Sequence, residues 1–430
     1  MNSEFSINVA RWEGSDEDAP EVAETSCSLS LQVKGVSLTQ AESDWSKSVS
    51  DSVYVSGYPL ALWLTSSWWR LRWESGRAQS GWKPPTGWRM NHELAAVGGG
   101  FIWPRVRFES DGETMHVSAL RSPAFSTEPI RYLNDIDANV SAKWFEKEAN
   151  HFVETVLSRL SDRALRDTDL QQTWDLLCQE RASPEQSTLR ILEAKLGFDP
   201  GAAPHNLLQL MQRLAANIGE QATAELAAGI GGDDAESNLR LVNRMAERKS
   251  IQSSMPSLRL PKAEGLEQPW HFGREMARSA RKQFGFGREP ISNAKLLKAL
   301  GIKESFPLAN TTAPIGLAVR DGAKTDLHFH KWRVDSQRFE AARFLGDYLI
   351  ADRNDRWLTT TDASTLRQKT QRAFAAEFLA PIAELEESMQ GDFSPDSIAD
   401  AADRFEVAPL LVRSHLANHG LIDKAAVNWE

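Results

Sequence analysis

The sequence predicts an α+β chain, because strand-like alternation dominates its beginning and helical periodicity dominates the remainder. The chain has 430 residues, whereas one domain usually spans about 100–200. Changes in the pattern divide it into four expected segments. These are a β-rich, Trp-rich domain (1–137), a helical region (138–249), a linker (250–269) and a mainly helical domain with a small sheet (270–430).

The first segment contains the clearest strand patterns. Residues 5–13 and 27–38 alternate apolar and polar side chains, and residues 105–120 form two such runs around Asp111-Gly112, a pair suited to a tight hairpin turn. Residues 58–75 instead predict a helix that is apolar on most sides, which is typical of a buried helix. The end of this stretch, "WWRLRW", also fits a strand.

The middle of the chain is expected to be helical. Residues 138–249 place apolar side chains at a spacing of 3–4 residues, with Gly and Pro between the runs, and this pattern predicts a helical bundle or arm. Residues 250–269 are rich in Ser and Pro and have little pattern, so we expect a linker there.

The last segment predicts helices around a small sheet. In order, the patterns indicate helices at 271–283 and 292–302, strands at 314–322 and 324–334, helices at 336–350 and 364–381, and two short helices at 397–422. The two short helices resemble a helix-turn-helix. The second of them offers only Arg413, His415 and His419, which is too little charge for a DNA-reading helix.

Composition and charge narrow the functional classes. The net charge of −10 argues against a chain that coats nucleic acid or an anionic membrane as a whole. The two cysteines, Cys27 and Cys178, are far apart and fit a reducing cytoplasm rather than a disulfide scaffold. The first residues show no signal-peptide pattern, and no apolar run reaches the roughly 18–20 residues of a membrane span. We therefore expect a cytoplasmic protein with no membrane partner.

The order of the C-terminal elements resembles the ImmA/IrrE family of bacterial metallopeptidases over roughly residues 271–421. The stretches that carry the resemblance are "LLKALGI", "QRFEAARFLGDYLI", "FAAEFLAP" and "ADRFEVAPLLVRSHLANHGLI". The resemblance implies a zincin-like fold, in which two His four residues apart on one helix bind zinc, the Glu after the first His is the general base, and a carboxylate on the next helix completes the ligands.

The residues that would perform this chemistry are replaced here. The His-Glu-x-x-His positions of the resemblance fall on Arg343, Phe344 and Asp347. Arg343 cannot bind a cation and Phe344 cannot accept a proton, and the basic stretch "RQKTQR" stands where the next carboxylate is expected. We expect Arg343 and Asp347 to pair across one helical turn and Phe344 to fill the space of the base. The packing positions of the resemblance survive: Phe339, Leu345, Gly346, Tyr348, Phe374, Leu379 and Pro381.

The resemblance therefore implies a pseudo-peptidase without catalytic residues and without a cofactor. Active members of the family cleave repressor-type proteins, so a relative that has lost its metal ligands is expected to bind a protein without cutting it. We expect a regulatory or assembly component of a bacterial stress, mobile-element or defence system.

A relocated metal site is an alternative. His328 and His330 are two residues apart in a predicted strand, a spacing at which both imidazoles face the same way. With Asp347 as a third ligand they would hold zinc, and the chain would be an active metallopeptidase. Two surface histidines on an edge strand are the competing interpretation.

The Trp-rich segment at 63–105 offers a third possibility. Eight of the fifteen tryptophans lie between Trp45 and Trp103, and residues 63–105 have a local charge of +4. Aromatic rings between cations suit a buried core with extended arginines, a protein interface, or a surface that binds single-stranded nucleic acid. The residues that would form such an interface are Trp63, Trp68, Trp69, Arg70, Arg72 and Trp73.

Overall fold

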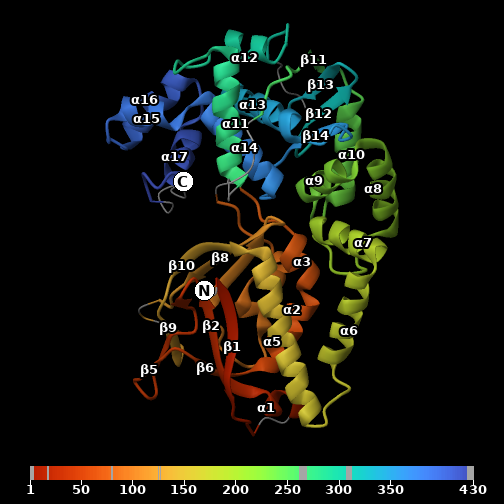
Figure 1. Cartoon of the computed structure of the whole chain (residues 1–430), viewed down its shortest axis with the longest axis vertical. Helices are drawn as coiled ribbons and strands as arrows, with labels where there is room; N and C mark the ends of the chain where they lie inside the picture. The colour runs from red at the N-terminus through yellow and green to blue at the C-terminus, as the bar shows by residue number, and fades with distance from the viewer. Residues whose placement is uncertain are drawn as a thin grey trace. The chain divides into compact units, whose positions relative to one another are not determined.

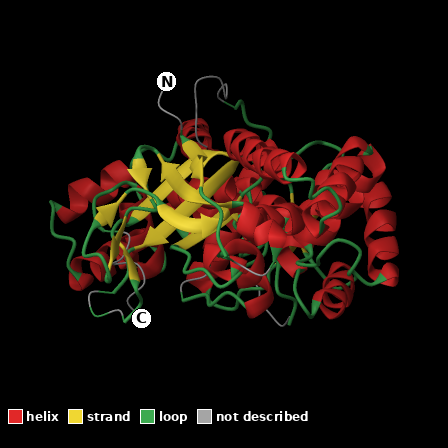
Figure 2. Ribbon diagram, turned by 90° about the horizontal axis from the view of Figure 1, so that it is seen from below, coloured by secondary structure: helices red, strands yellow, loops and turns green. Residues whose placement is uncertain are grey.

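The chain folds as two units that each combine helices and antiparallel strands. The computed structural model describes residues 4–423 except 17–18, 79–80, 124, 126, 261–268 and 307–311 (Figure 1). The first unit is Met1–Gly76 with Lys83–Ala203, and the second is Arg77–Trp82 with Pro204–Glu430. The described residues form both helices and antiparallel strands (Figure 2), which confirms the α+β class.

These boundaries correct the expected segments. The helical region predicted at 138–249 is not a domain, because its first part belongs to the first unit and the residues from Pro204 onward belong to the second. The predicted linker also contains a strand, β11 (Ile251–Ser253), which pairs with β13 (Lys324–His328). A strand of three residues is too short for its alternation to be recognised. Residues 261–268 of that predicted linker lie outside the described residues.

The described residues of the first unit form three small antiparallel sheets. In one, β2 pairs with β1, β3 and β6; the second has the order β10-β8-β7, and the third β5-β4-β9. The strands are β1 (Phe5–Trp12), β2 (Ser26–Val33), β3 (Val36–Ser37), β4 (Ala41–Ser43), β5 (Val49–Ser50), β6 (Val53–Ser56), β7 (Arg105–Ser110), β8 (Thr114–Leu120), β9 (Ile130–Tyr132) and β10 (Ile136–Ser141).

The predicted hairpin at 105–120 is confirmed. Strands β7 and β8 pair from Arg105 with Leu120 to Ser110 with Met115. Gly112 has a φ of +102°. The side chain of Asp111 accepts hydrogen bonds from the backbone amides of Glu113 and Thr114. The turn therefore forms for the reasons that the Asp-Gly pair suggested.

Helices complete the core of the first unit. They are α1 (Pro20–Glu24), α2 (Gly57–Ser66), α3 (Trp68–Trp73), α4 (Thr86–His92), the short 3-10 helix at Leu94–Val97, α5 (Ala142–Asp162), α6 (Asp169–Ala182) and α7 (Pro184–Lys195). Phe145 of α5 is fully buried and packs 5.0 Å from the ring of Phe5 and 5.5 Å from that of Phe108. Helix α5 therefore belongs to the same core as the strands, although its sequence pattern is that of the helical region.

The second unit surrounds one four-stranded sheet with helices. The sheet has the order β11-β13-β12-β14, with β12 (Gly316–Asp321) and β14 (Trp357–Thr360). The helices are α8 (His205–Ile218), α9 (Glu220–Ile230), α10 (Ala235–Ala246), α11 (Pro269–Phe284), α12 (Asn293–Ala299), α13 (Val334–Ile350), α14 (Leu366–Leu379), α15 (Ile382–Met389), α16 (Pro395–Phe405) and α17 (Pro409–Asn418). The predicted helices at 336–350 and 364–381 and the two short C-terminal helices are confirmed.

Two helices dominate the core of this unit. Helix α13 buries Phe344 and Leu345, and α14 buries Phe374 and Phe378, all with no exposed surface. The two helices approach closely at Gly346, where a Cβ atom would lie only 2.8 Å from the ring of Phe374. Among the described helices of both units, none combines the length and the apolar character that crossing a membrane requires.

Candidate functional site

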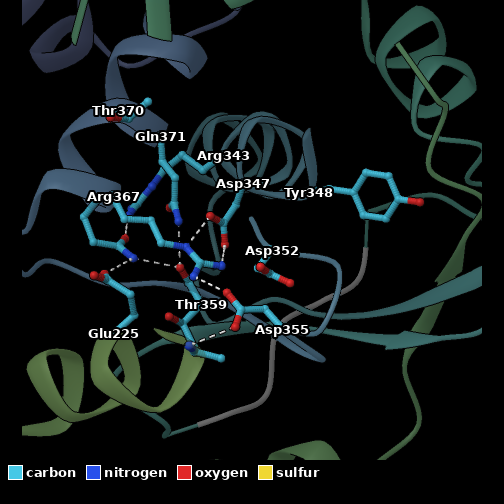
Figure 3. A network of polar contacts seen from close by, with 12 residues as sticks. Glu225, Arg343, Asp347, Tyr348, Asp352, Asp355, Thr359, Arg367, Thr370 and Gln371 are labelled. Atoms are coloured by element: carbon cyan, nitrogen blue, oxygen red, sulfur yellow. Dashed lines mark hydrogen bonds and ion pairs between the residues drawn. The ribbon is translucent and has the colours of Figure 1, made fainter. Parts of the chain in front are cut away.

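The predicted degenerate metal positions lie on α13 in the second unit, facing α14, β14 and α9. Thr365 caps α14 by accepting a hydrogen bond from the amide of Gln368, and this fixes the first turn of α14 beside Arg343 and Asp347. Figure 3 shows the side chains of α13, α14 and α9 converging on one polar network.

Asp347 is completely buried and is held by an arginine of the next helix. Its two carboxylate oxygens accept hydrogen bonds from Nε and Nη2 of Arg367 at 2.6 and 3.0 Å, a two-pronged ion pair. Arg367 also donates to Asp355 at 2.7 Å. Burial opposes the charge on Arg367, but Asp347 outweighs it and raises the pKa of the guanidinium. Both carboxylate oxygens of Asp347 are therefore occupied (Figure 3).

The expected pair between Arg343 and Asp347 is wrong. Arg343 donates through Nη2 to the carbonyl oxygen of Thr361 at 2.7 Å and to Oε1 of Gln368 at 2.5 Å. Burial lowers the pKa of this guanidinium, and the nearby Asp362 partly offsets the effect. A two-pronged contact with a neighbouring helix stabilises Asp347 better than the bent contact that one helical turn allows, because both of its oxygens can then be satisfied.

Phe344 lies in the apolar core, as expected for a ring in place of the general base. Its side chain has no exposed surface, and its ring packs edge-to-face on Phe329, with centroids 5.7 Å apart. Phe329 packs in the same way on Phe306, with centroids 5.8 Å apart. No group in this cluster can accept a proton from water.

The network extends from α14 to α9. Glu225 of α9 accepts hydrogen bonds from Oγ1 of Thr365 at 2.7 Å and from Nε2 of Gln368 at 3.1 Å. Asp355 also accepts one from the amide of Ala222 at 3.2 Å. These contacts fix α9 to the beginning of α14, so the polar groups at the predicted site connect elements of the second unit (Figure 3).

The relocated site of His328, His330 and Asp347 does not form. The strand β13 ends at His328, so the alternation that would have aligned His330 with it does not continue. His330 contacts Oε1 of the buried Glu340 at 2.5 Å through Nδ1, and Asp347 is bound to Arg367. His328 is buried, which lowers its pKa. Among the described residues, these three side chains do not form a group able to hold a metal ion.

The Trp-rich segment is a core and not an interface. Trp63, Trp68, Trp69, Arg70 and Arg72 are buried and Trp73 is half-buried. The segment "WWRLRW" is the helix α3, so its strand alternative is also wrong. The indole N–H of Trp69 donates to Glu180 of α6 at 2.8 Å, which anchors the ring inside the first unit.

The two buried arginines of this segment are neutralised inside the first unit. Arg70 pairs with Glu74 at 2.7 Å and with Asp199 at 3.0 Å. Arg72 pairs with Glu146 at 2.5 Å and stacks near the ring of Trp73. Cations that are buried and paired cannot reach the phosphates of a nucleic acid, so Arg70 and Arg72 do not contribute to such a surface. Lys83, Arg89 and Arg105 of the same segment are exposed.

A chemically distinctive cluster among the described residues was not predicted from the sequence. Glu377 of α14 lies beside His415 of α17 and His419, the residue that caps the C-terminus of α17, and ligand-type atoms of all three lie within 4.8 Å of one another. Burial opposes it, but His415 and Arg278 lower the pKa of Glu377 to about 2. Burial and the charge of Arg274 lower the pKa of His419 to about 4, which makes the neutral imidazole the form present at pH 7. The spacing His415-x-x-x-His419 was the available signal.

Comparisons with protein families, with curated proteins and with solved structures find no match to this chain.

Proposed function

We propose that this chain is a non-catalytic pseudo-peptidase that works by binding a protein, with a C-terminal unit that is a degenerate relative of ImmA/IrrE metallopeptidases. We place it in the cytoplasm of a bacterium, as a regulatory or assembly component of a stress, mobile-element or defence system. The observation that carries the proposal is the buried ion pair between Asp347 and Arg367, which occupies the position of the metal in the proposed ancestor.

The chemistry of the network supports the absence of peptidase function at this position. Zinc-dependent hydrolysis needs an open coordination position and a base that accepts a proton from the bound water. At this place the carboxylate of Asp347 is neutralised by Arg367, the guanidinium of Arg343 repels cations, and Phe344 offers only carbon. A buried ion pair that loses one partner is strongly destabilising, so a metal cannot displace Arg367 without a large cost.

A candidate contact for a protein partner lies at the start of the same helix. The side chain of Trp332 is 76% exposed, and Val334, the first residue of α13, is 51% exposed. Arg333 between them is exposed and pairs with Asp335 at 2.9 Å. Tryptophan and arginine are enriched in the residues that dominate protein interfaces, so this segment is the proposed contact with the partner.

A peptidase assay tests the first half of the proposal. The purified full-length chain is incubated with zinc and with unfolded casein or a mixed peptide library, with and without a chelator. We expect no cleavage that the chelator abolishes. Cleavage that the chelator abolishes would refute the pseudo-peptidase proposal. This holds also where the cleavage survives in an Arg343→Ala variant and disappears on mutation of a different cluster.

A binding assay tests the second half. A photoreactive residue at position 332 is used to capture and identify the partner, and binding of the purified pair is then measured. We expect Trp332→Ala to weaken binding by at least about 30-fold, the loss typical of a dominant interface residue. Leu410→Ala is the matched control, because Leu410 is 47% exposed in the same unit. Equal losses in both variants would reject Trp332 as the contact.

A further inference from the structure

We propose that Glu377, His415 and His419 form a binding site for a divalent transition-metal ion, with Zn²⁺ as the best match, that fixes α17 to α14. This site is separate from the network at Asp347, and the inference goes beyond the proposed function. Two imidazole nitrogens and one carboxylate oxygen are a ligand set that zinc prefers, whereas Mg²⁺ and Ca²⁺ require mainly oxygen ligands.

The two histidines are placed as metal ligands on a helix are placed. His415 lies in α17 and His419 is the residue that ends it, so the four-residue spacing puts both rings on the same side. Their ring centroids are 5.0 Å apart and their planes are nearly perpendicular, at 87°. The Nε2 atoms of both rings are buried and have no hydrogen-bond partner among the described residues. Buried polar atoms are normally satisfied by a partner, so two such nitrogens side by side are suited to bind a common ion.

The distance from His415 to Glu377 agrees with a shared ion. Nε2 of His415 lies 3.3 Å from Oε2 of Glu377 without the alignment of a hydrogen bond. Two ligands at about 2.0–2.1 Å from a tetrahedral zinc ion lie about 3.3 Å from each other. The same geometry therefore fits two atoms that bind one ion.

The other contacts of Glu377 leave room for this role. Oε1 accepts a hydrogen bond from Nε of Arg278 at 2.8 Å. Arg278 thus holds the carboxylate through Oε1 and leaves Oε2 to bind the ion. Oε2 accepts a long hydrogen bond from the amide of Ile382 at 3.3 Å, beside its contact with His415. A ligating carboxylate that is held by a second group is the usual arrangement in metal sites.

The nearby arginines reduce the affinity without removing the site. Arg274 is buried, its Nε has no partner among the described residues, and its charge acts on His419. A metal ion must bind close to this guanidinium and to Arg278, which already pairs with Glu377. We therefore expect Arg274→Gln to bind the metal more tightly than the natural chain, because it removes a repulsive charge and keeps a polar side chain.

Equilibrium dialysis against Zn²⁺ is the main test. The purified full-length chain is first freed of metal with a chelator, and bound zinc is then measured per chain. We expect one equivalent for the natural chain. Loss of an outer-shell partner typically lowers metal affinity by about 10- to 100-fold. His419→Gln removes a ligand itself, so it should lower the affinity for Zn²⁺ by more than this. His205→Gln is the matched control, since His205 is an exposed histidine of the same unit, and it should bind as the natural chain does.

The spectrum of bound Co²⁺ provides a readout that does not need a variant. Cobalt in a tetrahedral site of this kind absorbs visible light strongly, whereas cobalt in water absorbs weakly. We expect the natural chain to develop the strong absorption at one equivalent and Zn²⁺ to abolish it. Binding below about 0.1 equivalent, or equal binding by the natural chain and a folded His419→Gln variant, overturns the proposal and leaves an ordinary pair of His415 and Glu377.

Discussion

At the scale of single residues, buried charges with fixed partners determine what the two units can do. Asp347 is neutralised by Arg367 in the second unit, and Glu74 is neutralised by Arg70 in the first. A buried ion pair contributes little net stability relative to an apolar pair, but removal of one partner leaves a charge that water cannot reach. Each pair therefore makes its own position intolerant of change and closes it to other ligands.

The pair at Asp347 predicts a large and asymmetric response to mutation. Arg367→Met removes the partner of a fully buried carboxylate and should lower the free energy of unfolding by about 3–5 kcal/mol. Replacing both partners, as Asp347→Leu with Arg367→Met, should cost less than Arg367→Met alone, because no unpaired charge remains at position 347. Urea unfolding measures the free energy of unfolding of both variants.

An exposed pair is the control for that comparison. Arg240 pairs with Glu236 on the surface of α10, and Arg240→Met should change stability by no more than about 0.5 kcal/mol. If Arg367→Met cost no more than this control, Asp347 would not depend on Arg367, and the argument for a closed site would fail.

Glu74 predicts a dependence of stability on pH. Burial alone would raise its pKa, but hydrogen bonds from His92 and Arg70 outweigh it and lower the pKa below the value of about 4.3 in an unfolded chain. A carboxyl whose folded pKa is lowered stabilises the fold above its unfolded pKa, and the contribution disappears as pH falls through the folded value. The difference in unfolding free energy between the natural chain and Glu74→Gln should therefore shrink below pH 4. A difference that stays constant down to pH 2 would contradict this assignment.

At the scale of elements, the close crossing of α13 and α14 determines where the polar network around Asp347 forms. Gly346 allows α13 to approach Phe374 of α14, and this approach brings Asp347 within reach of Arg367. The elements themselves were largely predictable: the periodicity at 336–350 and the Asp-Gly pair at 111–112 specify local structure through neighbouring residues. Their partners were not predictable, because Arg367 is 20 residues from Asp347 and only the packing of two helices decides that they meet.

The crossing can be tested at its glycine. Gly346→Ala places a Cβ atom 2.8 Å from the ring of Phe374, a distance that requires the helices to shift. We expect a loss of about 1–3 kcal/mol from overpacking, although alanine is the better helix former by about 1 kcal/mol. Thermal unfolding measures the loss. Gly87→Ala in α4 is the control, because a Cβ there meets nothing within 4 Å, and it should not destabilise the chain.

At the scale of the whole molecule, sequence patterns locate secondary structure better than they locate units. The boundary expected at residue 137 follows a change from strands to helices, yet a change of element type does not mark the edge of a core. Phe145, Phe152 and Val156 of α5 are buried with the strands of the first unit. Similarly, Arg77 donates to the carbonyl oxygens of Gly229 and Gly231 in the second unit, so a short segment far away in sequence joins that unit. Such contacts depend on tertiary packing and leave no local pattern.

The boundary predicted at residue 137 and the first unit of the structure, which extends to Ala203, predict different behaviour of fragments. A fragment of residues 1–203 contains α5 and should unfold cooperatively, because Phe145 closes the core against Phe5 and Phe108. A fragment of residues 1–137 lacks Phe145 and exposes the strands that α5 covers, so we expect it to unfold without a cooperative transition. Tryptophan fluorescence during urea unfolding distinguishes them, since Trp63, Trp68 and Trp69 are buried in the intact core. A cooperative transition of the shorter fragment at the same urea concentration would show that the strands form a domain without α5.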